Sequence, residues 1–154
     1  MDRSSNSLVE YWRSQGIRLA PPADEAQIEW FEQRYGLQII LEFRDYLLTV
    51  NGMLQFANDD CDSNMFAFWQ LNRIRPIADE CPELQRSPEE GQYFVFADYM
   101  IWSWAYAVDL AASSATAGRV ILVGGLREQI VSPTFSGFVR LYTEDSRQLY
   151  ALPA

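Results

Sequence analysis

Large and small side chains alternate along Met100–Leu110, and this alternation defines the centre of the predicted fold. The large face carries Met100, Trp102, Trp104, Tyr106, Val108 and Leu110, and the small face carries Ser103, Ala105, Ala107 and Asp109. A period of two with aromatic and β-branched side chains predicts a central strand, with its bulky face in the core and its small face open to a helix. Tyr93–Phe96 predicts a neighbouring strand, and Ala97–Tyr99 between the two predicts a tight turn or bulge.

Apolar residues at helical spacing predict two consecutive helices before the strands. Asp24 is a good N-cap for the first helix, Gln27 completes a capping box, and Gly36 stands at its C-terminal end. The second helix carries an apolar stripe of Phe43, Tyr46, Leu47 and Val50. Asn51 and Gly52 then supply a left-handed exit. Because the two helices are so close in sequence, we expect them to pack as an antiparallel pair.

The segments around the central strands are shorter. Met65–Leu71 and Arg119–Val123 predict two further strands from their apolar, β-prone content. Asn72–Gly91 contains three prolines, so any helix there is expected to be short.

A C-terminal helix is predicted to begin at Ser132 and Pro133, as a cap followed by a first-turn proline. Its apolar stripe is Phe135, Phe138, Val139 and Tyr142. A short helical extension is expected within residues 5–16, before the helix pair. Helices, then mostly adjacent strands, then a helix is the order of an α+β domain. At 154 residues, the chain is predicted to form one domain over residues 1–154, with its core at about 24–143.

Composition and charge narrow the function. Apolar content of 49% is typical of a globular protein, and a net charge of −9 argues against direct nucleic-acid binding, because phosphates need compensating cations. Asp98 and Asp109 bracket an apolar run far shorter than the roughly twenty residues that span a membrane. The apolar cluster Leu8–Trp12 is too short and interrupted for a signal peptide. We therefore expect a cytoplasmic protein with free, reduced Cys61 and Cys81.

Histidine is absent, which removes the usual Ser-His-Asp and Cys-His nucleophile systems and nearly all zinc sites. Residues 60–64 open like a calcium loop, but Met65 stands where that loop requires glycine and Leu71 where it requires glutamate. Gly124 and Gly125 follow a predicted strand without a dinucleotide or P-loop pattern. The sequence therefore predicts no catalytic residue, metal or cofactor. An enzyme that uses only Asp and Glu is the remaining catalytic alternative.

Acidic side chains are concentrated in one segment. Between Ala57 and Gln92, eight acids stand against three arginines, whereas Arg119–Ala154 contains three acids and four arginines. The eight are Asp59, Asp60, Asp62, Asp79, Glu80, Glu83, Glu89 and Glu90. Two interpretations are open: a solvated surface that keeps the protein soluble, or a docking face for a cationic protein, whose association complementary charge would accelerate.

Several local motifs occur in the order found in a known family. They are Phe31-Glu32, Tyr35-Gly36, Asn51-Gly52, Trp69-Gln70-Leu71, Phe94–Tyr99, Tyr106–Leu110, and Ser132 with Phe135 and Phe138. Over about residues 24–143 the chain resembles the SUKH superfamily, the Smi/Knr-type domain common among bacterial toxin-immunity proteins. It departs at Leu37–Ile40, where many members have Leu-Pro between the first two helices.

The resemblance implies an α+β domain with a mostly antiparallel central sheet, on which an N-terminal helix pair and a C-terminal helix pack. It implies a non-catalytic protein that binds and neutralises a cognate toxin, often a nuclease; the acidic segment would suit a basic nuclease domain. The family pattern marks positions of the fold, so Asn51, Gly52, Trp69 and Asp98 are expected to be structural. A regulatory or scaffolding module of the same fold, with an endogenous partner, is the alternative.

Overall fold

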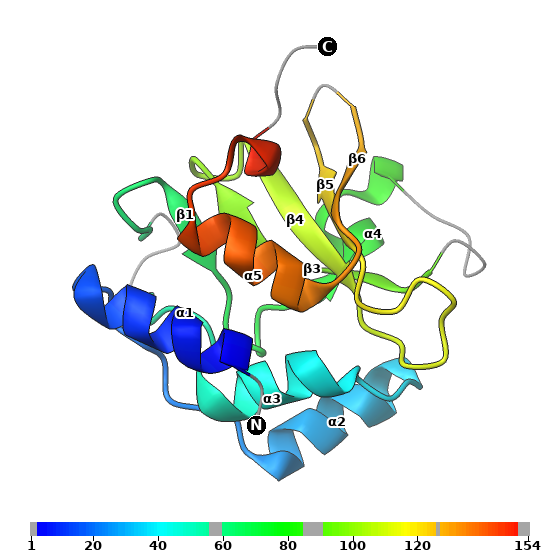
Figure 1. Ribbon diagram of the computed structural model, residues 1–154. Coiled ribbons are helices and arrows are strands. Elements are labelled where there is room, and N and C mark those ends of the chain that lie inside the picture. The colour runs from blue at the N-terminus through cyan, green and yellow to red at the C-terminus, as the bar shows by residue number, and fades with distance from the viewer. Residues whose placement is uncertain (1–2, 56–59, 85–90, 126, 151–154) are drawn as a thin grey trace.

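The computed structural model describes residues 3–55, 60–84, 91–125 and 127–150. Its helices and strands are arranged as Figure 1 shows. The helices are α1 (Arg3–Ser14), α2 (Glu25–Tyr35), α3 (Leu41–Thr49), α4 (Ile77–Glu80) and α5 (Phe135–Thr143), with 3-10 turns η1 (Pro82–Leu84) and η3 (Arg147–Leu149). The strands are β1 (Phe66–Phe68), β2 (Arg75–Pro76), β3 (Tyr93–Tyr99), β4 (Trp104–Asp109), β5 (Val120–Val123) and β6 (Gln129–Ser132).

The strands form one six-stranded sheet in the order β1-β3-β4-β5-β6, with β2 also paired to β3. Every pairing between these strands is antiparallel. β1 and β2 lie end to end along the same edge of β3, because β1 pairs with residues 97–99 and β2 with residues 94–95. The α+β class and the antiparallel sheet expected from the resemblance are therefore confirmed.

The hairpin turn at the centre of the sheet lies later in the chain than the sequence predicts. Ala97–Tyr99 belongs to β3, and the chain reverses through residues 100–103 before β4. The predicted bulge is present but sits one step earlier, between Val95 and Ala97. The prediction of a strand from Met100 was wrong, because Met100, Ile101 and Trp102 all have left-handed backbone angles.

α2 and α3 form the expected antiparallel pair. The Asp24 carboxylate accepts the backbone N–H of Gln27, whose side chain in turn accepts the N–H of Asp24, so the capping box is confirmed. Ala23 at the start of α2 donates its N–H to the carbonyl of Leu47 at the end of α3. Arg44 of α3 forms ion pairs with two glutamates of α2.

α5 begins later than predicted. Thr134 is its N-cap and accepts the N–H of Gly137, whereas Ser132 ends β6, a strand that the sequence did not reveal. The Ser132 hydroxyl instead donates to the carbonyl of Thr134 and steadies the strand-to-helix turn. Ser132 as the helix cap was thus wrong, although the buried stripe of the helix was predicted correctly.

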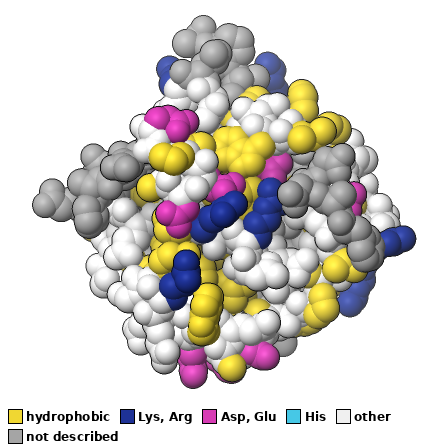
Figure 2. All heavy atoms as spheres, turned by 180° about the vertical axis from the view of Figure 1, so that it is seen from behind, with side chains coloured by type: hydrophobic (Ala, Val, Ile, Leu, Met, Phe, Trp, Pro, Cys, Tyr) yellow, Lys and Arg dark blue, Asp and Glu magenta, His cyan; other side chains and the backbone are white. Residues whose placement is uncertain are grey.

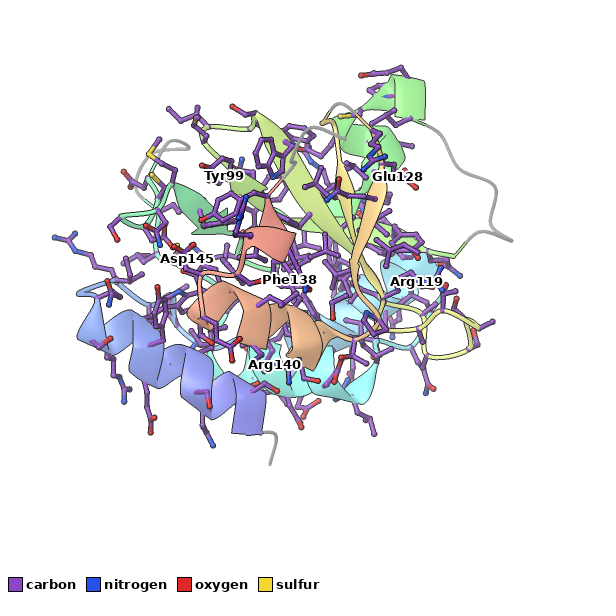
Figure 3. The ribbon with its side chains drawn as sticks, turned by 45° about the horizontal axis from the view of Figure 1, so that its top comes forward. Tyr99, Arg119, Glu128, Phe138, Arg140 and Asp145 are labelled. Atoms are coloured by element: carbon purple, nitrogen blue, oxygen red, sulfur yellow. The ribbon has the colours of Figure 1, made fainter. Side chains whose placement is uncertain are left out.

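α5 covers one face of the sheet with aromatic side chains. Phe138 packs against Phe68, Phe96 and Tyr106, with ring centroids between 5.2 and 6.1 Å apart. Figure 3 labels this fully buried residue and the exposed Arg140 of the same helix. The other face carries the small residues Ala105 and Ala107 of β4, beside Val123 and Ile121 of β5. α4 lies on that side of the sheet (Figure 1). Both faces are therefore covered, as the alternation of large and small residues predicts.

α1 is fastened to α5 by a buried polar contact. The indole N–H of Trp12 donates to the hydroxyl of Tyr142 at 2.8 Å, and that hydroxyl donates to the Asp62 carboxylate. α1 and the loop before β1 thus both depend on one tyrosine of α5.

Candidate functional site

Trp69, just after β1, lies at the centre of a buried polar cluster. Its indole N–H donates to Oδ2 of Asp98 on β3 at 2.7 Å. The guanidinium carbon of Arg73 lies 3.8 Å from the centroid of the Trp69 ring, and one of its nitrogens lies 3.9 Å from the same carboxylate oxygen. Arg73 therefore covers the ring face while Asp98 satisfies the ring N–H, and the three side chains hold one another in place.

Asn51 and Gly52 reach the same segment from the end of α3. The Asn51 side chain accepts the backbone N–H of Leu71 at 2.8 Å. Gly52 has a φ of +73°, and a Cβ there would lie 2.6 Å from the carbonyl oxygen of Trp69. Only glycine lets the chain pass so close in that conformation. The structure thus brings Asn51, Gly52, Trp69 and Asp98 together. Their role in stabilising the fold remains a prediction, which substitutions can test.

Asp98 is buried, and its second oxygen, Oδ1, accepts the backbone N–H of Trp102 at 3.2 Å. Burial raises the pKa of Asp98, while the hydrogen bonds from Trp69 and Trp102 and the charge of Arg73 oppose that rise. Burial likewise lowers the pKa of Arg73, against the pull of Asp98. The charged groups of Asp98 and Arg73 are therefore partly removed from water, and a ligand bound beside them would reduce their contact with water further.

The turn held by Asp98 exposes apolar side chains in a strained backbone. Met100, Ile101 and Trp102 have φ values of 50°, 52° and 62°, which are uncommon for residues other than glycine. Ile101 is 62% exposed. The Trp102 indole N–H donates to Glu80 of α4 at 3.1 Å, so the turn is tied to the far side of the sheet. Strained backbone of this kind is frequent at functional sites.

A groove runs between α2 and residues 70–75. Its two parts have volumes of about 390 and 580 Å³, and they share Trp30, Phe31, Leu71 and Asn72. Trp30 is 62% exposed. Figure 2 shows the molecule from behind, the side that carries α4, and there arginine side chains lie among hydrophobic and acidic ones. We call this the arginine groove, defined by Trp30, Arg34, Arg73, Arg75 and Asp79.

Three arginines line the arginine groove in a protein whose net charge is −9. The Arg34 guanidinium lies 5.5 Å from the Trp30 ring centroid and 5.4 Å from that of Tyr35. Arg75 forms an ion pair with Glu80 at 2.6 Å and keeps 49% of its side-chain surface exposed. Arg73 and Arg75 have the carboxylates of Asp98 and Glu80 as neighbours, and Asp79 also lines the groove. The groove therefore combines arginines with an aromatic rim, residue types that are enriched where proteins bind partners.

Sequence reasoning missed this groove, although a signal was present. The core stripe of α2 is Ile28, Phe31 and Tyr35, and Trp30 lies outside it, followed by Arg34 four residues later. Trp30 on the polar side of α2, with Arg34 at i+4, is the local signal that could have pointed to the groove.

The predicted acidic residues do not form one face. Asp59, Glu89 and Glu90 lie outside the described residues. Asp62 is only 7% exposed, and its carboxylate accepts hydrogen bonds from the backbone of Asn64 and Phe66 as well as from Tyr142. It is therefore not available as an exposed contact.

The remaining acids are divided between two places. Asp79, Glu80 and Glu83 lie on α4 and η1, where Asp79 and Glu83 are exposed and Glu80 is engaged with Arg75 and Trp102. Asp60 lies at the loop before β1, which Figure 1 places on the other side of the molecule from α4. The sequence grouped residues that the fold separates.

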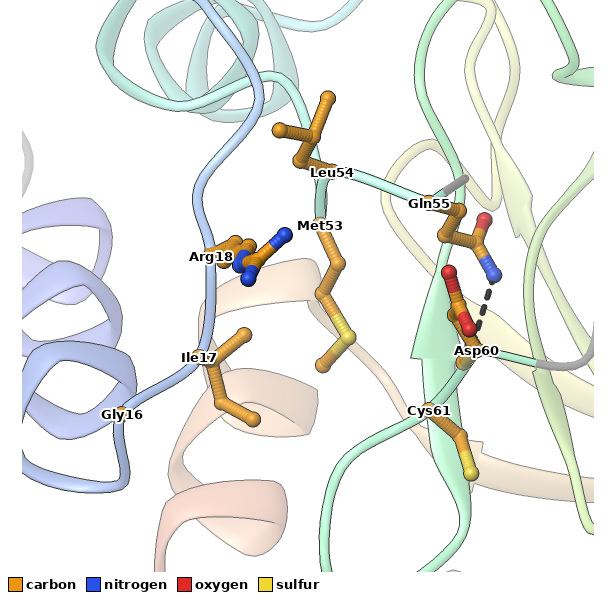
Figure 4. A pocket seen from close by; sticks show the side chains of 8 residues that line it. All are labelled: Gly16, Ile17, Arg18, Met53, Leu54, Gln55, Asp60 and Cys61. Atoms are coloured by element: carbon orange, nitrogen blue, oxygen red, sulfur yellow. Dashed lines mark hydrogen bonds between the residues drawn. The ribbon is translucent and has the colours of Figure 1, made fainter. Parts of the chain in front are cut away.

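Asp60 lines a pocket of about 310 Å³ between the α1–α2 connection and the loop before β1 (Figure 4). Gln55 donates its amide N–H to the backbone carbonyl of Asp60 at 2.8 Å, and Met53, Arg18 and Cys61 complete the wall. In the described part of the chain, which includes both cysteines, Cys61 and Cys81 are not joined by a disulfide. Within the described ranges, no three His, Cys, Asp or Glu residues are placed to hold a metal ion.

Comparison with known families assigns the fold. The sequence model of the SMI1/KNR4 family (SUKH-1) matches residues 22–141, most of the chain. The chain belongs to this family, which is typical of immunity proteins in polymorphic toxin systems. The resemblance drawn from the motifs is therefore confirmed. A comparison with curated proteins gives no significant match. Among the described residues, no helix has the length and apolar character needed to cross a membrane.

Proposed function

We propose that this protein is an immunity protein, which binds a cognate bacterial toxin and neutralises it without catalysis of its own. The observation that carries the proposal is membership of the SMI1/KNR4 family over residues 22–141. A packed sheet with helices on both faces supports it, because such a scaffold presents a rigid surface to a partner. A cytoplasmic location is part of this proposal, because an immunity protein must be present in the compartment in which its toxin acts.

A second part of the proposal concerns the partner's charge. Asp79 and Glu83 are exposed on α4 and η1, next to Glu80. Together with the net charge of −9, they would favour association with a basic toxin such as a nuclease domain. Asp62 is excluded from this surface by its burial. We call this surface the acidic edge.

The test of the function is a purification from the native host. The tagged protein is isolated, and what accompanies it is identified by mass spectrometry. A toxin domain in equimolar amount, whose lethality is suppressed when this chain is co-expressed, is the expected result. An endogenous regulatory partner without suppression of any toxin would contradict immunity and favour the scaffolding alternative.

The acidic edge has a separate test. Glu83→Arg, which leaves the lining of the arginine groove unchanged, should slow association with the toxin by about threefold at low salt, because it reverses a steering charge. The matched control makes the same charge change at the exposed residue Glu10 on α1. Equal slowing by both variants would show that only net charge matters, and no slowing would exclude the edge.

A further inference from the structure

We propose that the arginine groove is a docking site for a short acidic segment of a partner protein, with carboxylates on the arginines and an apolar side chain against Trp30. The partner is the toxin if the proposed function holds. The inference rests on the positions and charges of the groove residues. Besides the acidic edge, it proposes a second contact, in which arginines of this protein bind carboxylates of the partner.

The groove has the right chemistry for carboxylates. Guanidinium groups present parallel N–H donors that match a carboxylate. Arg34 is exposed and held over two aromatic rings, so its donors are pre-oriented at little entropic cost. Arg75 has one carboxylate neighbour, Glu80, and still keeps 49% of its side chain exposed. Both can accept a further anionic partner without breaking the core.

Arg73 fixes the floor of the groove. It is held by the Trp69 ring and by Asp98, and its side chain is 24% exposed. A guanidinium that the protein has already partly removed from water loses less hydration when a ligand covers it. The groove floor is therefore partly desolvated before a ligand binds. Asp79 also lines the groove and would repel a carboxylate placed beside it, which restricts where the carboxylates of the segment can lie.

Charge complementarity selects a protein segment over a nucleic acid. The chain as a whole carries −9, which repels a polyanion whose phosphates extend beyond the groove. A short segment can place a few carboxylates on the exposed Arg34 and Arg75, whereas a polyanion would extend over the acidic residues beside the groove, beginning with Asp79. The exposed Trp30 adds apolar contact that a tryptophan typically contributes at the centre of protein interfaces.

The probe is a short capped peptide of alternating glutamate and leucine, titrated into the ¹⁵N-labelled full-length protein and followed by NMR. The signal of the Trp30 indole N–H, assigned with Trp30→Phe, should shift with the backbone signals of Arg34 and Arg75. The same peptide with glutamine in place of glutamate should bind at least about tenfold more weakly, since the charge-assisted bonds are lost.

Two variants decide where the peptide binds. Arg34→Gln with Arg75→Gln should weaken binding by about tenfold or more, whereas Arg140→Gln, an exposed arginine on α5, should leave it unchanged. Equal binding by all variants, or no shift of the groove signals, would overturn the proposal. So would an equal shift with a single-stranded oligonucleotide of similar length. A shift of the same signals with protein concentration alone would mean that a second copy occupies the groove, which also overturns it.

The toxin assay separates this inference from the proposed function. If the wild-type chain suppresses a toxin and Arg34→Gln with Arg75→Gln suppresses it equally well, the groove is excluded as the toxin contact while immunity stands. If no toxin is suppressed but the peptide binds as described, immunity fails and the groove remains an acidic-segment site of another partner.

Discussion

The indole N–H of Trp69 donates to the carboxylate of Asp98 at 2.7 Å, which joins the chain after β1 to β3 across the interior. The same carboxylate accepts the backbone N–H of Trp102 and so also holds the turn that leads into β4. One buried aspartate therefore ties together the edge of the sheet, the central hairpin and, through Arg73, the floor of the arginine groove.

Asp98→Ala should lower the free energy of unfolding by about 2–4 kcal/mol, because it leaves the Trp69 N–H and the Trp102 N–H without their acceptor. Urea unfolding at neutral pH measures the change. Glu29→Ala, at an exposed position on α2, is the control and should change stability by less than about 0.5 kcal/mol. A loss as small as that of the control would contradict a structural role for Asp98.

The contribution of Asp98 should depend on pH in a definite direction. Its pKa in the fold is raised above the ordinary value of 3.8, chiefly by burial. The part of its contribution that depends on pH is therefore fully present below about pH 3.8 and is lost as the pH rises through the raised pKa, whereas the hydrogen bonds from Trp69 and Trp102 also form at neutral pH. Asp98→Asn lacks this titration, so the stability of the wild type relative to Asp98→Asn should fall as the pH rises from acid towards neutral.

Urea unfolding of both proteins over a series of pH values measures that difference. A difference that grows with pH would contradict the expectation. It would mean that the donors around the carboxylate outweigh its burial and that the pKa is depressed in the folded state.

Gly52→Ala and Gly36→Ala form a matched pair. Both glycines have left-handed backbone, with φ of +73° and +66°, so each substitution carries a conformational cost of about 1 kcal/mol. A Cβ at Gly36 has nothing within 4 Å, whereas one at Gly52 would lie 2.6 Å from the Trp69 carbonyl oxygen. Gly52→Ala should therefore be more destabilising than Gly36→Ala by at least about 1 kcal/mol. Equal thermal unfolding midpoints for the two variants would exclude the close approach of the chain at Gly52 to the Trp69 carbonyl oxygen.

Tyr142→Phe should loosen α1. It removes the hydroxyl that accepts from Trp12 and donates to Asp62, and leaves both buried groups without that partner. We expect a loss of about 1–3 kcal/mol and faster hydrogen exchange of the α1 amides. Tyr35→Phe, at a half-buried tyrosine of α2, is the control. Unchanged exchange in α1 would contradict the role of this contact.

The sequence predicted the helices and the sheet class well because their signals are local. The capping box at Asp24 and the stripe of α5 depend on residues three or four positions apart. The turn between β3 and β4 was misplaced for a physical reason. Asp98 has the side chain of a turn residue but lies in a strand, where a tryptophan distant in sequence satisfies it. The apolar residues Met100–Trp102 have the composition of a strand but form the turn.

The proposed binding surfaces were harder to predict, because they depend on which segments meet in space. The acids that are grouped in sequence are separated between the loop before β1 and α4, and Asp62 is buried. Arg34 and Arg75 are far apart in sequence, and the packing of α2 against residues 70–75 brings them into one groove. Only the tertiary structure shows that an acidic chain carries a groove lined by three arginines.

The most direct test of the account is a titration of the purified toxin with this protein while the toxin's activity is measured. Neutralisation by binding predicts that activity falls in proportion to the protein added, reaches its end point at an equimolar ratio and does not change with longer incubation. It also predicts that active toxin is recovered when the complex is separated under denaturing conditions and refolded. Progressive loss of activity at a small fraction of the toxin concentration, with permanently altered toxin, would contradict non-catalytic neutralisation.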